Sequence, residues 1–253
     1  MKFLLSSAVI VLMWGYSLSA RAQDEITLLA PGPIRGTLDQ LIPGFEGKTN
    51  RKVRVTFGQG NQTQHQIASG EAVDVPIMQT PFQEVLASGN VVASSATTLA
   101  RVAVVVVVRN GAPKPDISTP EAVKRMLLAA RSISYPDPSG SASGANFMET
   151  IKKLDLIDQM QPKTKSATGG AGALAMVAKG EVDIGFCFLT EAKRAPGIDI
   201  VGSLPHEIST STSLVGFVST HARDPAAAKA LLDYLSSPDA AAIYTAQGLQ
   251  PGP

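Results

Sequence analysis

The 253-residue chain contains one cysteine, Cys187, so an internal disulfide bond is excluded. Cys187 lies in the apolar run DIGFCFL, which favours a small buried core residue. A dominant charge is also absent, because 22 basic residues stand against 21 acidic residues. Nucleic acids and anionic membrane surfaces require a basic face, so the composition predicts neither as a partner. A small charged ligand remains compatible with this balance, because one local group of hydrogen-bond donors is enough to bind it.

The motifs of metal, nucleotide and hydrolase sites are missing. No H-E-x-x-H, no G-x-S-x-G and no phosphate loop ending in GKS or GKT occurs in the chain. We therefore predict no metal and no cofactor. For the three histidines, an exposed surface position is the expectation: His65, His206 and His221.

The one apolar stretch whose length invites comparison with a membrane span lies at the N-terminus. Residues 1–22 combine Lys2, an apolar core and a small-x-small site at Ala20-Arg21-Ala22. A membrane anchor is the alternative, but serines and a glycine interrupt the run, and a span needs about 20 continuous apolar residues. We predict a cleaved signal peptide over residues 1–22 and a soluble, exported protein that does not insert into the membrane after cleavage.

The rest of the chain alternates short β-branched runs with helical patterns, which predicts an α/β fold. We expect strands at residues 25–30, 52–58, 73–78, 101–109, 132–137, 163–168, 182–189 and 212–219. We expect helices at residues 37–48, 62–70, 80–89, 120–130, 142–156, 170–180, 224–237 and 238–247, with Pro81 in the first turn of its helix.

The run RVAVVVVVR at residues 101–109 is long enough to pass from one lobe to another and is typical of a strand buried on both faces. Two α/β sets joined by it predict two lobes, each with a mixed sheet, and a cleft between them. Lobe 1 is expected to comprise residues 23–105 and 213–253, and lobe 2 residues 106–212.

Small and polar residues gather at four predicted strand-to-helix junctions, at residues 31–37, 57–63, 136–146 and 166–174. Glycines let a ligand approach the backbone, and the free N–H groups of a first helical turn favour an anion. The alternative is that turns simply require these residue types. Four such junctions at one cleft predict an anion site.

At these junctions the chain resembles the molybdate-type periplasmic solute-binding proteins of ABC transporters. The stretch LLAPGPIRGTLDQLIPGFEGKTNRKVRVTFGQGNQTQ is similar to their N-terminal lobe, and ISYPDPSGSASGAN, GAGALAMVAKGEVDIGFCF and AAAKALLDYLSSPDAAAIYTAQGLQP to their second lobe and final helices. The resemblance implies a type II, Venus-flytrap fold whose lobes close on a small anionic ligand. It also implies a periplasmic, monomeric protein with an ABC permease as partner.

The resemblance extends less well to the residues that bind an oxyanion. The family serine of the first turn aligns with Pro33, which has neither a hydroxyl nor an N–H group, and the family tyrosine aligns with Phe188. The second serine aligns with Asn61, and two backbone contacts align with Ser143 and Gly170.

Arg35 appears in the first junction instead, and planar amides stand nearby in the sequence. An arginine matches a carboxylate with two parallel N–H bonds, so an organic carboxylate suits this set better than a tetrahedral oxyanion such as molybdate. The alternative for Arg35 is a solvated residue at a helix start. The predicted ligand-binding residues are Pro33, Ile34, Arg35, Gln59, Asn61, Gln79, Ser139, Ser141, Ser143 and Gly170.

The same family includes relatives that resemble aconitate isomerase, and this resemblance implies a second function. It is a cofactor-independent isomerase of an unsaturated polycarboxylate, whose allylic proton transfer needs an acid/base group. The candidates for that group are His65, Asp137 and Glu149, and the sequence does not choose among them.

Overall fold

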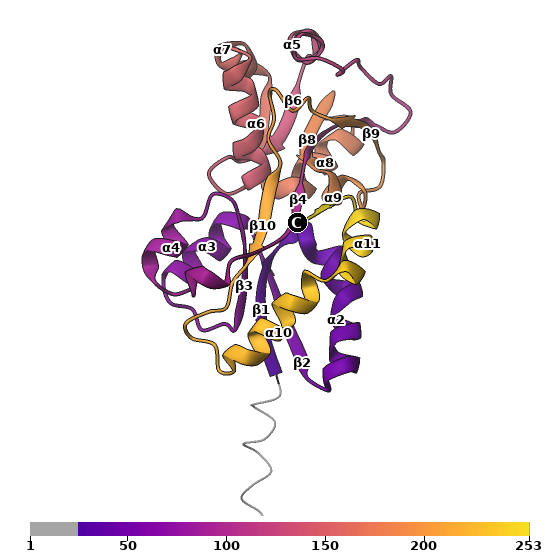
Figure 1. Cartoon of the computed structure of the whole chain (residues 1–253). Helices are drawn as coiled ribbons and strands as arrows, with labels where there is room; N and C mark the ends of the chain where they lie inside the picture. Colours follow the sequence, from indigo (N-terminus) through magenta and orange to yellow (C-terminus); the bar gives the residue numbers. More distant parts are fainter. Residues whose placement is uncertain (1–24, 253) are drawn as a thin grey trace, which may run out of the picture.

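The computed structural model describes residues 25–252 as two lobes, each built on one mixed sheet (Figure 1). The predicted signal peptide lies outside the described residues. Lobe 1 here denotes the elements on the six-stranded sheet, of order β11-β4-β10-β3-β1-β2, and lobe 2 those on the five-stranded sheet, of order β7-β6-β8-β5-β9. The exact lobe boundaries at residues 105/106 and 212/213 stay a prediction.

The strands of lobe 1 are β1 (Glu25–Pro31), β2 (Lys52–Gly58), β3 (Val75–Gln79), β4 (Thr97–Val102), β10 (Thr212–Gly216) and β11 (Gln250–Pro251). Its helices are η1 (Gly32–Ile34), α2 (Arg35–Thr49), α3 (Gly60–Ala68), α4 (Gln83–Ser88), η2 (Ala93–Ser95), α10 (Pro225–Leu235) and α11 (Pro238–Ala246). β1 pairs in parallel with β2 and β3, whereas β10 runs antiparallel to β3 and β4. Parallel and antiparallel pairs thus meet in one sheet, as the α/β prediction requires.

The strands of lobe 2 are β5 (Val104–Arg109), β6 (Ile133–Pro136), β7 (Thr164–Ala167), β8 (Ile184–Phe188) and β9 (Ile198–Ser203). Its helices are α5 (Pro120–Ala129), α6 (Ala142–Lys153), α7 (Ile157–Met160), η3 (Gln161–Lys163), α8 (Gly169–Ala178) and α9 (Leu189–Ala192). β6 pairs in parallel with β7 and β8, and β5 runs antiparallel to β8 and β9.

The expected single strand at residues 101–109 is wrong, because the structure divides it at Ala103 into β4 and β5. β4 pairs with β10 and β11 of lobe 1, whereas β5 pairs with β8 and β9 of lobe 2. One strand cannot follow the twist of two separate sheets, so its hydrogen-bond ladder ends where it leaves the first. The expected passage between lobes is confirmed, and β10 marks the return (Figure 1).

Local sequence signals set the ends of two helices of lobe 1. Gly70 and Gly89 have positive φ angles of 90° and 72° just after α3 and α4, as helix-ending glycines do. Pro81, expected in the first turn of α4, instead precedes that helix, which begins at Gln83.

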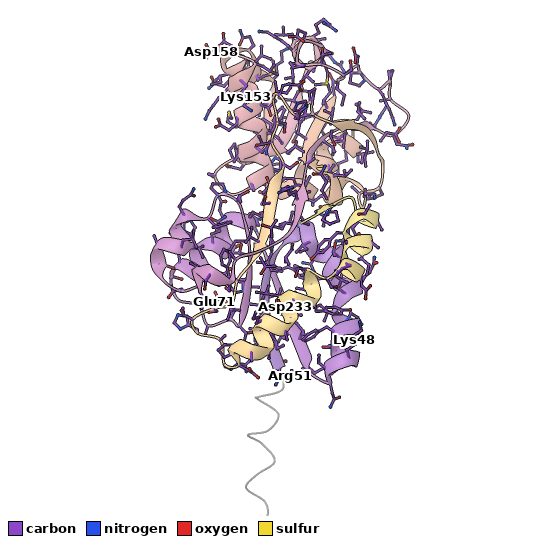
Figure 2. All side chains as sticks on the ribbon, in the orientation of Figure 1. Lys48, Arg51, Glu71, Lys153, Asp158 and Asp233 are labelled. Atoms are coloured by element: carbon purple, nitrogen blue, oxygen red, sulfur yellow. The ribbon has the colours of Figure 1, made fainter. Side chains whose placement is uncertain are left out.

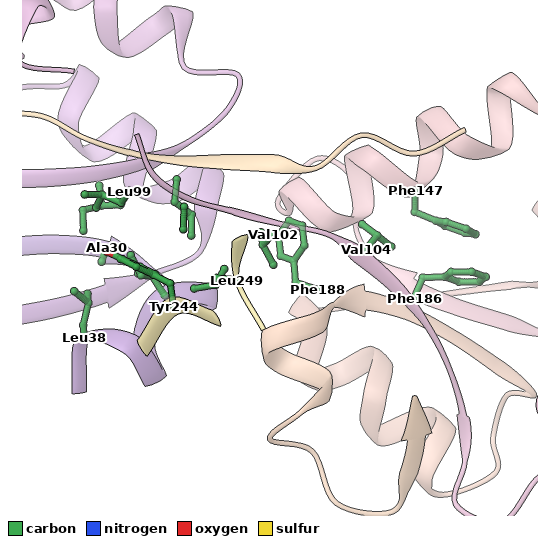
Figure 3. Close-up of a cluster of buried hydrophobic side chains, with 14 of the residues drawn as sticks. Ala30, Leu38, Leu99, Val102, Val104, Phe147, Phe186, Phe188, Tyr244 and Leu249 are labelled. Atoms are coloured by element: carbon green, nitrogen blue, oxygen red, sulfur yellow. The ribbon is translucent and has the colours of Figure 1, made fainter. Parts of the chain in front are cut away.

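The apolar core is continuous from one lobe to the other. Figure 3 shows its side chains extending from Leu38 and Tyr244 past Val102 to the stacked rings of Phe147 and Phe186. The charged side chains labelled in Figure 2 lie outside this core: Lys48, Arg51, Glu71, Lys153, Asp158 and Asp233. No helix of residues 25–252 combines the length and the apolar character that a membrane crossing requires.

Candidate functional site

A small cavity of about 90 Å³, the central cavity, lies where the strand ends of the two lobes meet. Its lining comes from four junctions and two strand ends, and consists of Gly32, Pro33, Gly58, Gln59, Gly60, Gln79, Gly140, Ser141, Gly169, Gly170, Phe188 and Glu191. Strand ends followed by helix starts are where α/β folds place their ligands. The sequence analysis predicted a site at these junctions, and the tertiary structure brings residues of all four to one cavity.

Three helices that begin at the central cavity have no side-chain cap. The residues preceding α3, α6 and α8 are Gln59, Ser141 and Thr168, and none of their side chains accepts a hydrogen bond from the first helical turn. Outside this lining, α5, α10 and α11 each carry a side-chain cap, whereas the short helices α4 and α7 do not. The first-turn N–H groups of α3, α6 and α8 are therefore available to an anion.

Gln79 adds a side-chain donor to these backbone groups. It is 2% exposed at the end of β3, and its amide nitrogen Nε2 has no hydrogen-bond partner within residues 25–252. The backbone carbonyl of Gln79 accepts a hydrogen bond from the Gln64 side-chain amide over 2.9 Å, which holds the backbone in place. A Cβ on Gly60 would clash with the Gln79 amide oxygen, so this glycine makes the close approach of α3 possible. A buried amide without a partner is costly unless a ligand pairs with it.

The central cavity also contains a carboxyl group that the sequence analysis missed. Glu191 lies in the first turn of α9 and accepts a hydrogen bond from the Phe188 N–H over 3.2 Å. A Cβ on Gly170 would clash with its carboxylate, so this glycine in α8 makes room for the group. Burial raises the pKa of Glu191 from 4.5 to about 6, against the lowering effect of the Phe188 N–H. A glutamate three residues after a strand end is a helix-start signal that could have drawn attention to it.

A larger cavity of about 590 Å³, the arginine cavity, adjoins the central cavity and shares Gly32, Pro33 and Glu191 with it. Its remaining lining consists of Arg35, Gly36, Ala171, Leu174, Ala175, Ala178, Lys179, Thr190, Arg194, Ala195, Pro196 and Gln247. Arg35 comes from lobe 1 and Arg194 from lobe 2, so the two guanidinium groups border one space from opposite lobes.

The Arg35 guanidinium lies over the Phe57 ring, with its Cζ atom 3.8 Å from the ring centroid. This stacking offsets part of the cost of a cation near a helix start. In the described part of the chain, neither Arg35 nor Arg194 forms an ion pair. Thr190 lines the same cavity, and its buried hydroxyl has no hydrogen-bond partner within residues 25–252.

A third space, the outer cleft of about 770 Å³, is lined in part by Asn61, His65 and Glu149. The Asn61 amide donates a hydrogen bond to the Ser139 carbonyl of the other lobe, so it closes the lobes against each other. His65 and Glu149 are exposed; the His65 ring shares a hydrogen bond of 3.1 Å with Glu84, and Glu149 forms an ion pair with Lys152 over 2.6 Å.

The predicted site residues thus divide by position. Those that line the central cavity are Pro33, Gln59, Gln79, Ser141 and Gly170. Arg35 lines the arginine cavity, and Asn61 lines the outer cleft.

The remaining predicted residues lie beside these spaces. The Ile34 side chain is fully buried in the hydrophobic core, which leaves only its backbone for a ligand. Ser143 is buried in the first turn of α6 and shares a 3.0 Å hydrogen bond with Ser141. Ser139 donates its hydroxyl and its N–H to Asp137, and these bonds hold the pKa of the Asp137 carboxyl below its usual value. Among residues 25–252, no three His, Cys, Asp or Glu side chains are grouped as metal ligands would be.

The sequence matches the family model of bacterial extracellular solute-binding proteins over residues 26–250. Aconitate isomerase from a Pseudomonas species is 34% identical over 242 residues, which are 93% of this chain and 91% of that protein. The molybdate-binding protein ModA of Escherichia coli K12 is 25% identical over 230 residues, 89% of each chain. The solved periplasmic molybdate-binding protein of Azotobacter vinelandii has a TM-score of 0.73 at 20% identity and covers 90% of this chain and 100% of its own. The predicted resemblance and the predicted type II fold with two mixed α/β lobes are confirmed.

Proposed function

We propose a function on the premise that this chain belongs to the bacterial extracellular solute-binding protein family. The protein holds a small organic anion with more than one carboxylate across the central cavity and the arginine cavity. It does so as a periplasmic, monomeric binding protein that presents its ligand to an ABC permease. The location, the monomeric state and the permease are parts of the proposal.

One observation carries this proposal: two guanidinium groups without ion pairs, Arg35 and Arg194, border one cavity from opposite lobes. A bound carboxylate between them gains charge-assisted hydrogen bonds from both lobes, so it favours the closed arrangement. A second carboxylate of the same ligand fits the adjoining central cavity, where the starts of α3, α6 and α8 and the Gln79 amide supply donors.

A compact tetrahedral oxyanion fits this site less well. Pro33 and Phe188 both line the central cavity, at the positions where the family resemblance places a serine and a tyrosine. Neither side chain donates a hydrogen bond. Two donors that a molybdate site of this family uses are therefore replaced by apolar groups, while the arginine cavity adds cations beside the central cavity.

Thermal unfolding with a ligand panel tests the proposal. The panel comprises molybdate, sulfate, succinate, tricarballylate, citrate and cis- and trans-aconitate, and a ligand that binds the native state raises the Tm. We expect a rise with one or more polycarboxylates and none with molybdate. A rise with molybdate alone would refute the carboxylate proposal.

Arginine variants test the part that each guanidinium plays. Arg35→Gln and Arg194→Gln should each weaken binding of the active polycarboxylate by about 10- to 100-fold in calorimetric titration, as expected when a charge-assisted hydrogen bond is lost. Arg125→Gln is the matched control, because Arg125 is an exposed arginine of α5 that lines none of the three cavities. Equal affinities for all three variants would show that the arginine cavity binds no carboxylate.

A second function, isomerisation of an unsaturated polycarboxylate, is favoured by a specific observation. Glu191 places a carboxyl group with a raised pKa in the central cavity, and a relative of 34% identity bears the name aconitate isomerase. Ultraviolet absorbance of cis- or trans-aconitate, followed with protein far below the ligand concentration, separates the two functions. Sustained turnover shows an enzyme, and a saturable binding signal without turnover shows a binding protein alone.

A further inference from the structure

We propose that the Glu191 carboxyl group is the catalytic proton carrier for an allylic double-bond shift in an unsaturated polycarboxylate bound across the central and arginine cavities. The inference rests on the proposed function and names the reacting group of its second activity. It replaces the three acid/base candidates drawn from the sequence, none of which lines either cavity.

The first observation that supports this role is the position of Glu191. Glu191 belongs to the linings of both cavities, so it stands at their shared boundary. A ligand with one carboxylate at the uncapped helix starts and another at Arg35 and Arg194 must cross this boundary. The carbons between its carboxylates then pass beside Glu191, where a proton can be exchanged.

The second observation that supports this role is the orientation of the Glu191 carboxyl group. The Phe188 N–H holds oxygen Oε2 at 3.2 Å, and oxygen Oε1 has no hydrogen-bond partner in the described chain. Gly170 presents no side chain to the carboxylate, whereas any larger residue would clash with it. One oxygen is therefore held and the other is left for a ligand, as a positioned acid/base group requires.

The reaction needs no oxidant and no second reactant. The Glu191 carboxylate takes a proton from the methylene carbon that lies between the double bond and a carboxylate. The released C–H electron pair becomes the new double bond, and the electron pair of the former double bond accepts a proton from the Glu191 carboxyl at the far carbon. One proton leaves and one arrives, so Glu191 returns to its starting form. In aconitate the shift restores the same arrangement of groups, and rotation about the former single bond before the new double bond forms decides whether the product is cis or trans.

The surroundings of Glu191 favour this exchange. The titratable groups around it are Arg35 of α2, Lys179 after α8, Arg194 after α9 and Cys187 of β8. The cations stabilise the negative charge that spreads onto the ligand's carboxylates during the shift. Because burial raises the pKa of Glu191 to about 6, the group is ionised at neutral pH and still a stronger base than an exposed glutamate.

The test compares Glu191→Gln with wild type by two separate measurements. Turnover of cis- and trans-aconitate is followed by absorbance, and deuterium uptake into their methylene carbon by NMR in D₂O. Binding of the saturated analogue tricarballylate, which cannot shift a double bond, is measured by calorimetry. Glu121→Gln is the matched control, because Glu121 is exposed in the first turn of α5, away from all three cavities.

We expect Glu191→Gln to lower turnover and deuterium uptake by about 100- to 10,000-fold, the usual contribution of a general acid/base. Tricarballylate affinity should stay within about threefold, and wild-type kcat/KM should rise with pH through about 6. Turnover that survives in Glu191→Gln overturns the proposal, and so does tight binding by wild type without turnover or deuterium uptake. The latter result leaves the proposed binding function intact, whereas failure to bind every polycarboxylate refutes the binding function itself.

Discussion

Replacement of Glu191 by glutamine should stabilise the ligand-free protein at alkaline pH. The pKa of the Glu191 carboxyl is 4.5 when the group is exposed and about 6 in the folded chain, because burial disfavours its charged form. The folded state therefore binds the proton more tightly than the unfolded state. The stability from this proton is fully present below pH 4.5 and is lost as the pH rises through about 6.

The size of the effect follows from the difference between the two pKa values. At about 1.4 kcal/mol per pKa unit, a rise from 4.5 to about 6 corresponds to about 2 kcal/mol of lost stability at pH 8. Glutamine is nearly isosteric, keeps an oxygen to accept the Phe188 N–H and does not ionise. Glu191→Gln should thus exceed wild type by about 2 kcal/mol at pH 8 and match it at pH 4.5. For a chain of this size, the gain is a Tm rise of about 4–8 °C at pH 8.

Urea unfolding of both proteins at pH 4.5 and pH 8 measures this effect. All other titrating groups are shared, so they cancel in the difference between the two proteins. Glu121→Gln, at an exposed site, should show no such pH-dependent gain. The reasoning is refuted if Glu191→Gln is less stable than wild type at pH 8, because an ionised Glu191 would then be stabilised by a partner and not penalised by burial.

Three further outcomes follow from the packing. Gly170→Ala should weaken polycarboxylate binding at least tenfold, because its Cβ would displace the Glu191 carboxylate. Gly172→Ala in the same helix has its Cβ at 3.4 Å from its nearest neighbour, so it should bind normally and gain up to about 1 kcal/mol of stability. Equal affinities of the two variants in calorimetry would contradict the predicted effect of Gly170→Ala. Asp74 is buried and accepts hydrogen bonds from two backbone N–H groups, a hydroxyl and a guanidinium. Asp74→Asn should therefore lower the free energy of unfolding, measured in urea, by about 3–5 kcal/mol. A loss below about 1 kcal/mol would refute the view that these hydrogen bonds stabilise the fold. Cys187 is fully buried and burial raises the pKa of its thiol, so a thiol reagent should label it only after unfolding, and rapid labelling of the native protein would contradict its buried position.

Some features of the fold could be predicted because they depend on neighbours in the sequence. The helix at residues 225–235 follows Asp224, whose carboxylate caps it, and Gly70 and Gly89 end α3 and α4 with positive φ angles. Hydrophobic periodicity and turn residues act within a few positions, so they are readable without a structure. By contrast, β9 at Ile198–Ser203 was not predicted, because within residues 25–252 it pairs with β5 alone, which lies far away in the sequence.

The sequence alone determined the class of the protein: an α/β chain of the solute-binding family, with small and polar residues at the strand-to-helix junctions. It also predicted Gln59, Gln79 and Gly170, which the structure places at one cavity. Only the tertiary structure placed Arg35 and Arg194 at one cavity, and only it placed the Glu191 carboxylate against Gly170. The physical reason is that a helix or turn follows from local geometry, whereas a cavity forms only between residues that folding brings together. The pKa of Glu191 is raised only when those residues remove water from its carboxyl group.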